Sequence, residues 1–354
     1  TKAMTGRAAQ IAPCIACNQA CLDHTFSGKI SSCLVNPRAC YETELEITPS
    51  GAPKTVAVVG AGPAGLSTAI TAARRGHSVT LFDREDEIGG QLNMAKQIPG
   101  KEEFWGLVDW YRTMLETTGV TVQLGHDVAA DDLQDFDEVV IATGVTPRDP
   151  DIDGQDAQHV LSYIDVLRHN KDVGETVAIV GAGGIGFDVA EYLVHSGVSP
   201  TTSLPDWMRE WGVADPSEHR AGLAPEGPQP EPAARRVTLL QRKAEKPGKR
   251  LGKTTGWIHR AVLAMKNVKM VAGVNYEHIG EGGLAISFGE ARENPEVIPG
   301  ETIVLCAGQV PERTLADALF ARGQDCHVIG GADVAAELDA KRAIDQGTRL
   351  AATL

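Results

Sequence analysis

Five of the seven cysteines in this 354-residue chain fall within residues 13–40. Four of them follow the spacing C-x2-C-x3-C-x11-C, namely Cys14, Cys17, Cys21 and Cys33. Three thiolates within one compact turn and a fourth after a loop suit a [4Fe-4S] cluster or a structural zinc ion, which spacing alone separates poorly. Cys40 is surplus and is the alternative to Cys33 as fourth ligand. Such crowding in a chain of this size indicates a metal rather than a disulfide framework.

A glycine-rich sequence, GAGPAG at residues 60–65, stands where a dinucleotide fingerprint must stand, after an expected strand and at the start of an expected helix. Gly60 allows the tight turn, Gly62 lets a pyrophosphate approach the backbone, and Gly65 lets helix and strand pack closely. Asp83 ends the next expected strand and is placed to accept hydrogen bonds from ribose hydroxyls. An ordinary glycine turn is the alternative interpretation. The predicted nucleotide-binding residues are Gly60, Gly62, Ala64, Gly65 and Asp83.

The same unit returns as GAGGIG at residues 181–186, again between an expected strand and an expected helix. Its second strand is delayed to residues 235–243, RRVTLLQRK, and ends in two basic residues where the first unit has an acid. A basic residue at that place pairs with the 2′-phosphate of NADP, whereas an acid favours NAD. A solvated basic strand end is the alternative. We therefore expect NADPH, bound by Gly181, Gly183, Gly186, Arg242 and Lys243.

Two dinucleotide units in one chain imply that a hydride passes between two cofactors, and the first unit suits FAD. Further cofactor contacts are expected at small-residue turns elsewhere: Gly90, Gln91, Gly144, Gly308, Gly331 and Asp333. The final helix would begin beside the isoalloxazine ring and stabilise negative charge on it, although Asp333 could instead only cap a helix. A flavin that receives a hydride needs a one-electron outlet, which zinc does not provide. This context favours the [4Fe-4S] cluster.

The order of these elements predicts an α/β fold with two Rossmann-like dinucleotide-binding domains, the second inserted in the first, after a cysteine-rich iron-sulfur segment. The expected bounds are 1–52 for the cysteine segment, 53–165 and 301–354 for the FAD domain, and 166–300 for the NADPH domain. Residues 198–236 hold seven of the nineteen prolines and are expected to form a surface insertion, with a short helix over 206–212.

Composition narrows the class of protein. The formal net charge of −14 argues against nucleic acid or an anionic membrane as partner, because both reward a basic surface. The uncharged stretch 55–73 is interrupted by its glycine-proline turn and is not expected to span a membrane. No signal peptide precedes the cysteines, so we expect a soluble, cytoplasmic protein. The chain begins with Thr1, which suggests a fragment of a longer polypeptide or a processed start.

These motifs, together with EIGGQLNMAKQIPGKEEF (87–104) and LQRKAEKPGKRLGKTTGWIHR (240–260), resemble a known group of flavoproteins. They are similar to the C-terminal half of bacterial NADPH-dependent 2,4-dienoyl-CoA reductases, in the trimethylamine dehydrogenase-like family. The likeness runs nearly end to end and is weakest over 198–236. It implies that NADPH reduces FAD and that the cluster passes electrons singly to FMN, for reduction of dienoyl-CoA in unsaturated fatty acid β-oxidation.

In that family FMN and substrate lie in an N-terminal (β/α)8 barrel, for which this chain has no room. The catalytic acid–base residues are therefore expected in the barrel, and none is expected in this chain. Three other hypotheses remain: a relative that reduces enoates or oxidises amines, a stand-alone NADPH-FAD-iron-sulfur subunit like the small subunit of glutamate synthase, and a non-enzymatic flavin-binding domain. Two intact fingerprints and a complete cysteine set argue against the last.

Overall fold

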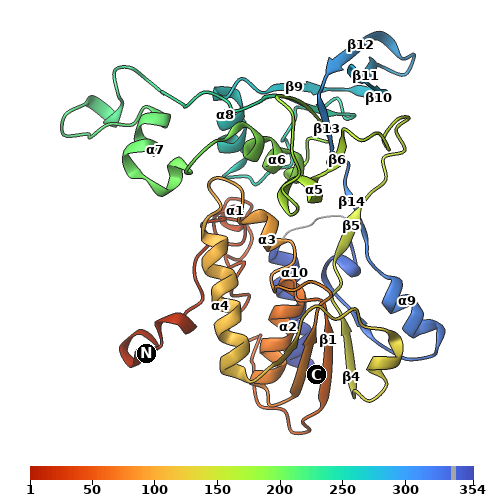
Figure 1. Ribbon diagram of the computed structural model, residues 1–354. Coiled ribbons are helices and arrows are strands. Elements are labelled where there is room, and N and C mark those ends of the chain that lie inside the picture. The colour runs from red at the N-terminus through yellow and green to blue at the C-terminus, as the bar shows by residue number, and fades with distance from the viewer. Residues whose placement is uncertain (336–339) are drawn as a thin grey trace. The chain divides into compact units, whose positions relative to one another are not determined.

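The computed structural model describes residues 1–335 and 340–354, which divide into two compact units. Unit 1 comprises Thr1–Asn93, Glu103–Thr146 and Gln309–Leu354, and unit 2 comprises Met94–Glu102 and Pro147–Gly308. Each unit contains a five-stranded parallel sheet with helices on it (Figure 1). The predicted α/β class with two Rossmann-like sheets is therefore confirmed.

The sheet of unit 1 has the strand order β15-β4-β1-β2-β3. Its strands are β1 (Thr55–Val59), β2 (Ser78–Phe82), β3 (Thr121–Gln123), β4 (Glu138–Ile141) and β15 (His327–Val328). The sequence TVAVV makes β1 a nearly continuous buried run, as expected for a central parallel strand covered on both faces. Two short strands, β5 (Val145–Pro147) and β14 (Gln309–Pro311), pair with each other.

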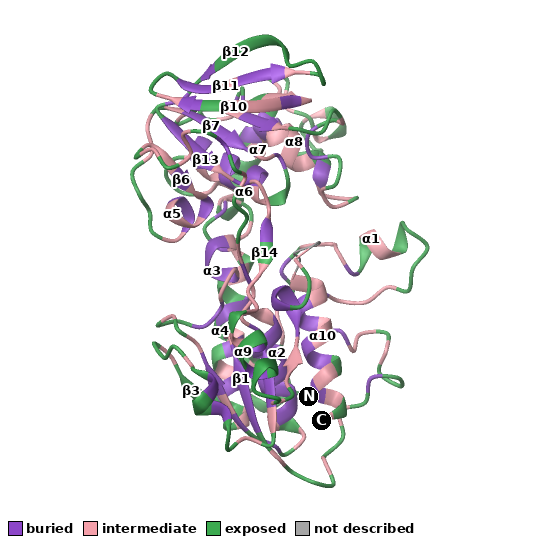
Figure 2. Ribbon diagram, turned by 90° about the vertical axis from the view of Figure 1, so that its right-hand side faces the viewer, coloured by how far each residue is buried: buried purple, intermediate pink, exposed green. Residues whose placement is uncertain are grey.

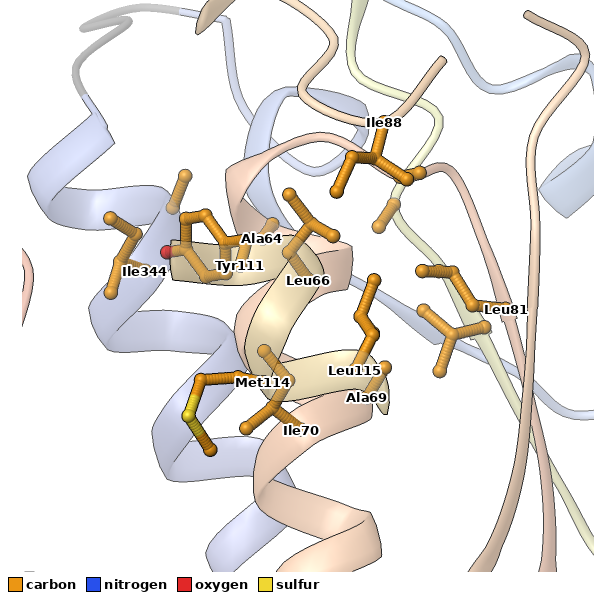
Figure 3. Packing of buried hydrophobic residues seen from close by; sticks show 14 of the residues in the cluster. Ala64, Leu66, Ala69, Ile70, Leu81, Ile88, Tyr111, Met114, Leu115 and Ile344 are labelled. Atoms are coloured by element: carbon orange, nitrogen blue, oxygen red, sulfur yellow. The ribbon is translucent and has the colours of Figure 1, made fainter. Parts of the chain in front are cut away.

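Helices cover both faces of this sheet. On one face lie α2 (Pro63–Arg74), α4 (Glu103–Thr118) and α10 (Ala340–Thr353), and on the other lie α9 (Thr314–Ala321) and η3 (Ala130–Leu133). Val56 and Val58 face the first core, and the alternate residues Ala57 and Val59 face the second. Figure 3 shows the first core, where fully buried Tyr111 of α4 shares a hydrogen bond of 3.0 Å with Ser67 Oγ of α2.

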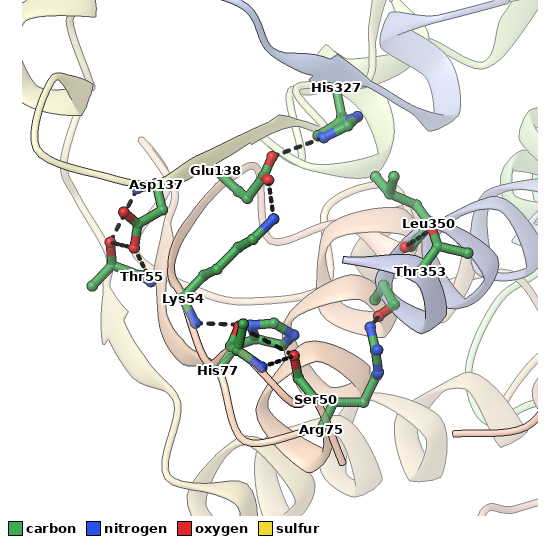
Figure 4. Close-up of polar contacts among 12 residues, drawn as sticks. Ser50, Lys54, Thr55, Arg75, His77, Asp137, Glu138, His327, Leu350 and Thr353 are labelled. Atoms are coloured by element: carbon green, nitrogen blue, oxygen red, sulfur yellow. Dashed lines mark hydrogen bonds and ion pairs between the residues drawn. The ribbon is translucent and has the colours of Figure 1, made fainter. Parts of the chain in front are cut away.

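Polar side chains join the first residues of three strands of unit 1 (Figure 4). Lys54 Nζ lies 2.5 Å from one oxygen of Glu138, and His327 Nε2 lies 3.0 Å from the other. Thr55 donates its backbone N–H and its hydroxyl to Asp137, each at 2.7 Å. The hydrogen bond from Lys54, and then that from His327, hold the pKa of Glu138 below its usual range. These contacts fix the end of the sheet opposite the glycine-rich turn.

The sheet of unit 2 has the strand order β6-β13-β7-β8-β9. Its strands are β6 (Val160–Ser162), β7 (Thr176–Val180), β8 (Arg236–Gln241), β9 (Lys269–Ala272) and β13 (Thr302–Leu305). One face carries α5 (Tyr163–Leu167), α6 (Gly184–Val194) and α8 (Gly256–Met265). The other carries an antiparallel sheet of β10 (Val274–Gly280), β11 (Gly283–Phe288) and β12 (Glu293–Pro299). Figure 2 shows β7 buried and β12 largely exposed.

The units have other bounds than the predicted domains. Strand β13 pairs with both β6 and β7, so all three belong to the sheet of unit 2. Residues 147–165 and 301–308, which the sequence assigned to the FAD domain, therefore lie in unit 2, as do residues 94–102. The physical reason is hydrogen bonding between strands far apart in the chain, which a local hydrophobic pattern does not encode.

Two regions carry only short elements. The cysteine segment contains η1 (Ala3–Thr5), η2 (Ala8–Gln10) and α1 (Leu22–Thr25). The insertion contains η4 (Pro200–Thr202), α7 (Leu204–Trp211) and η5 (Arg220–Gly222). Two further short helices, α3 (Leu92–Ala95) and η6 (Gly330–Ala332), lie outside both regions. The short helix predicted in the insertion is confirmed as α7. Within residues 1–335 and 340–354, no helix has both the length and the apolar character that crossing a membrane requires.

Candidate functional site

The first fingerprint turn is shaped by three glycines with different surroundings. Gly60 has φ +109°, and a Cβ there would lie 2.3 Å from the carbonyl oxygen of Ala142. A Cβ on Gly65 would lie 1.8 Å from the carbonyl oxygen of Gly60. Gly62, by contrast, has no heavy atom within 4 Å of its ideal Cβ position. The turn is therefore closed by backbone at its two ends and open at its centre, directly before α2.

Asp83 lies against this turn. Its Oδ2 accepts the backbone N–H of Ala61 at 2.5 Å, and its Oδ1 accepts the N–H of Glu85 at 2.9 Å. The carboxylate thus holds the conformation of the turn in this structure. Its predicted contact with ribose hydroxyls stays a prediction.

Of the other predicted FAD segments of unit 1, one lies against the same turn and two others lie against each other. Gly89 donates its N–H to the carbonyl of Ala61 at 2.8 Å, and a Cβ on Gly90 would lie 3.0 Å from the Cα of Gly62. A Cβ on Gly331 would lie 3.0 Å from the carbonyl carbon of Gly144. Gln91 follows this segment and is half-buried. The structure thereby brings together turns that the sequence separates widely.

Asp333 is exposed at the end of η6, where its Oδ2 accepts a hydrogen bond from Gln346 Nε2 of α10 at 2.9 Å. Residues 336–339, just before α10, lie outside the described residues. The predicted approach of the start of this helix to the flavin therefore stays a prediction, as does the role of Asp333.

The second fingerprint repeats the geometry of the first. Gly181 has φ +112°, and a Cβ there would lie 2.3 Å from the carbonyl oxygen of Cys306. A Cβ on Gly186 would lie 1.8 Å from the carbonyl oxygen of Gly181, and nothing lies within 4 Å of the ideal Cβ position of Gly183. The two turns are the same structure built twice. Gly308 lies farther along unit 2, with the guanidinium of Arg148 3.5 Å from its ideal Cβ position.

Arg242 and Lys243 are exposed directly after β8, next to the second turn. The side-chain amide of Gln241 donates to the carbonyls of Lys243, at 2.9 Å, and of Glu245, which folds this basic segment back on the strand end. The structure thus places the two predicted basic residues at the same edge of the sheet as Gly181, whose N–H bonds to the carbonyl of Leu240 at 2.8 Å.

Sequence reasoning missed Tyr276 of β10. Its hydroxyl donates to the carbonyl of Leu240 at 3.2 Å, the same carbonyl that receives the N–H of Gly181. Burial raises the pKa of this hydroxyl, and the charge of Arg242 acts in the opposite direction. A tyrosine at an ordinary strand position carries no spacing signal, so only the fold could reveal it.

A buried carboxylate hydrogen-bonded to a histidine lies on the helix that follows the second turn. Glu191 of α6 is 5% exposed, and its Oε1 lies 2.8 Å from Nδ1 of His259 on α8. One turn earlier on α6, Asp188 lies 2.6 Å from Lys101 Nζ. The segment 251–260, for which the sequence suggested either a nicotinamide contact or an interface, thus packs on the fingerprint helix through His259.

The cysteine segment centres on Cys17. Burial raises the pKa of its thiol, a backbone hydrogen bond at Gln19 opposes this, and charges on three neighbouring cysteines raise it further: Cys21, Cys33 and Cys14. The N–H of Ala16 lies 3.4 Å from Cys14 Sγ. Ala16 and Asn18, with φ of 52° and 58°, curl this loop in left-handed backbone.

All seven cysteines are free thiols. Cys40 is exposed, with its N–H 3.2 Å from a carboxylate oxygen of Glu42. Over residues 1–335 and 340–354, no group of three or more His, Cys, Asp or Glu side chains is arranged to hold a metal ion. The thiols that act on Cys17 are the other three of the predicted ligand set, but the ligand set itself stays a prediction.

Comparison with known proteins places this geometry in a family. The pattern of the pyridine nucleotide-disulphide oxidoreductases matches residues 54–340. A metal reductase of Desulforamulus reducens is 32% identical over 337 residues, which cover 94% of this chain and 49% of the relative. An NADH oxidase of Thermoanaerobacter brockii is 38% identical over 208 residues, which cover 56% of this chain and 32% of that protein.

Among solved structures, a 2-naphthoyl-CoA reductase in complex with 2-naphthoyl-CoA superposes with a TM-score of 0.83 at 26% identity, and the match covers 100% of this chain and 48% of that one. The chain therefore spans half or less of the length of these relatives. With two equivalent open glycine turns in one polypeptide and a family match over 54–340, the chain belongs to the pyridine nucleotide-disulphide oxidoreductase family, oxidoreductases that use FAD and a nicotinamide cofactor.

Proposed function

We propose that this chain is the NADPH-oxidising half of a 2,4-dienoyl-CoA reductase whose FMN-containing (β/α)8 barrel lies outside it. Bound FAD would supply the conversion of a hydride into single electrons, which a [4Fe-4S] cluster would conduct toward the FMN. The residues of this chain would bind and orient these groups, and the acid–base chemistry on the dienoyl-CoA would belong to the barrel.

The observation that carries the proposal is the pair of turns that are closed by backbone at their end glycines and open at the centre, at Gly62 in the first turn and at Gly183 and Gly184 in the second. At each, backbone crowding at the flanking glycines fixes the turn, and the central glycine leaves room for a pyrophosphate. The following helices, α2 and α6, direct their first N–H groups and their positive dipole ends to that space. A chain with two such places is suited to hold two dinucleotides.

The preference for NADPH is supported by the exposed Arg242 and Lys243 beside the second turn. A guanidinium at the end of the second strand pairs with a 2′-phosphate and would gain nothing from the hydroxyl of NADH. Asp83, at the equivalent strand end of the first turn, gives that site the acidic character expected for an unphosphorylated ribose. The two sites would thus sort FAD and NADPH by charge.

The electron outlet is supported by the surroundings of Cys17. Three further thiols act on its sulfur, and a backbone N–H is directed to it at Gln19, as at thiolates that carry a metal cluster. Charges of like sign raise the pKa of Cys17, so these thiols gain stability together when a cluster of iron ions neutralises them. The four thiols therefore have the number and the chemistry that the proposed cluster needs, while the described residues do not hold them in a metal-binding arrangement.

The nature of the acceptor is supported by chain length and by one relative. This chain covers 48% of the 2-naphthoyl-CoA reductase chain, so that protein has as much chain again beyond the matched part, and its name describes reduction of a CoA thioester. A dienoyl-CoA is a substrate of the same chemical class. The barrel in the same or a separate polypeptide would complete the enzyme.

The test uses the chain purified without oxygen. We expect it to contain FAD and iron, to lose its flavin absorbance on mixing with NADPH, and to support NADPH-dependent reduction of 2,4-dienoyl-CoA when an FMN-loaded reductase barrel is supplied. Flavin reduction without transfer to that barrel, but with transfer to another protein, would favour an electron-transfer subunit. Absence of flavin reduction by either NADPH or NADH would overturn the proposal.

A further inference from the structure

Tyr276 connects the small antiparallel sheet of unit 2 to the strand end beside the second fingerprint turn. Its hydroxyl lies 3.2 Å from the carbonyl oxygen of Leu240, near the end of β8. That carbonyl also accepts the N–H of Gly181, the first residue of the turn, at 2.8 Å. The phenol oxygen therefore stands at the strand end where the adenosine half of a dinucleotide lies in this fold.

The hydroxyl proton of Tyr276 can change partner at little cost. The carbonyl of Leu240 keeps the N–H of Gly181 if the hydroxyl turns away, so no buried acceptor loses its only hydrogen bond. A phenol hydroxyl donates one hydrogen bond and rotates about its C–O bond. It could thus donate to an anionic oxygen that arrives beside the turn.

Arg242 brings positive charge to the same place. It follows the end of β8 by one residue and is exposed, and its charge acts on the hydroxyl of Tyr276. Gln241 holds the following segment by hydrogen bonds to the carbonyls of Lys243 and Glu245. Leu240, whose carbonyl accepts the tyrosine hydroxyl, lies two residues before Arg242, so a 2′-phosphate attracted by Arg242 would arrive at the strand end that the tyrosine contacts.

We propose that Tyr276 is a specificity-determining residue that donates a hydrogen bond to the 2′-phosphate of NADPH, together with the charge of Arg242. This inference rests on the proposed use of NADPH and extends it to a residue of β10 that lies outside the fingerprint and its second strand. NADH presents a neutral hydroxyl at that position, so the tyrosine would discriminate between the two cofactors.

The test measures equilibrium dissociation constants of 2′,5′-ADP and 5′-AMP by calorimetry, which needs no electron transfer. We expect the unmodified chain to prefer 2′,5′-ADP and the Tyr276→Phe variant to lose about tenfold to a hundredfold of that preference, the loss expected for one hydrogen bond to a charged group. The matched control is Tyr192→Phe in α6, whose hydroxyl lies 3.3 Å from Asn170 and should not affect either constant.

Other outcomes separate the inference from the proposed function. Equal weakening of both ligands in Tyr276→Phe, or no change in either, would show a structural role and overturn the inference. An unmodified chain that binds both ligands equally would overturn the NADPH preference itself. Loss of preference in Tyr276→Phe but not in Arg242→Ala would support Tyr276 and contradict the role given to Arg242.

Discussion

Glu191 of α6 and His259 of α8 share a hydrogen bond of 2.8 Å between carboxylate and imidazole, which ties the first turn of α8 to the fingerprint helix. Burial raises the pKa of Glu191, and the hydrogen bond of His259 opposes it. Burial would lower the pKa of His259, but the hydrogen bond and charge of Glu191 raise it overall. Both groups therefore hold their protons more tightly in the folded chain than in the unfolded one.

This pair predicts how the stability of unit 2 depends on pH. A group whose pKa is raised on folding contributes stability that is complete below its unfolded pKa and is lost as pH rises through its folded pKa. For His259 the loss begins near pH 6.5, its unfolded value, and continues above it. Hydrogen-exchange protection of α6 and α8 should therefore fall from pH 6.5 upward.

Substitutions at the pair test the cause. His259→Ala should cost about 3 kcal/mol of local stability, because it leaves the buried carboxylate of Glu191 without this partner. The double variant Glu191→Met with His259→Leu should recover most of that loss, since two apolar groups need no pairing. It should also lose the pH dependence. If the double variant is as unstable as His259→Ala, the cost comes from packing and not from the charge.

The central glycines predict separable losses of the two nucleotides. Gly62 and Gly183 have extended backbone and open space around their ideal Cβ positions, so alanine should be tolerated by the fold at both. The added methyl group would stand where a pyrophosphate approaches. We expect Gly62→Ala to weaken FAD binding by tenfold or more and to leave 2′,5′-ADP binding intact. Gly183→Ala should do the reverse, as measured by flavin content and calorimetry.

The flanking glycine provides the control. In Gly65→Ala the new Cβ would meet the carbonyl oxygen of Gly60 at 1.8 Å, a clash that backbone must move to relieve. That variant should unfold unit 1 rather than weaken one ligand, with a cost above about 4 kcal/mol. If Gly62→Ala unfolds the chain as well, the open centre of the turn is not a ligand space.

The sequence predicted those features whose physics is local. Both glycine turns could be identified because strand, turn and helix are adjacent in the chain. The end glycines are required by close backbone contacts, which lie within a few residues or on the neighbouring strand. The boundaries of the FAD domain could not be predicted, because β6 and β13 join the sheet of unit 2 through hydrogen bonds to strands far away in the sequence. The hydrogen-bond partners of Glu191 and Tyr276 could not be predicted either, since each lies 36 or more residues away in the sequence.

The polar side chains at the end of the first sheet opposite the glycine-rich turn predict that unit 1 loses stability at low pH. The pKa of Glu138 is lowered in the folded chain, chiefly by Lys54, so its contribution is present above the unfolded carboxyl pKa and is lost as pH falls through the folded value. Glu138→Gln should reduce hydrogen-exchange protection of β4 by at most about 1 kcal/mol at neutral pH. Near pH 3 the difference from the unmodified chain should disappear.

A matched variant checks that this effect is specific. Glu116→Gln removes an exposed carboxylate from α4 and should change β4 protection at neither pH. If Glu138→Gln reduces the hydrogen-exchange protection of β4 equally at both pH values, the glutamine has disturbed packing. The ion pair with Lys54 then does not cause the loss of stability at low pH.

For the cysteines we predict that Cys17→Ser and Cys40→Ser have different effects on the iron content of the chain. Cys17 is half-buried among three thiols, so Cys17→Ser should remove most of the iron from anaerobically prepared chain and abolish electron transfer to a supplied barrel, while flavin reduction by NADPH continues. Cys40→Ser should keep the iron, because Cys40 is not among the thiols that act on Cys17. The reverse result for Cys33→Ser and Cys40→Ser would make Cys40 the fourth ligand. Zinc in place of iron in the unmodified chain would remove the one-electron outlet, because zinc does not change oxidation state.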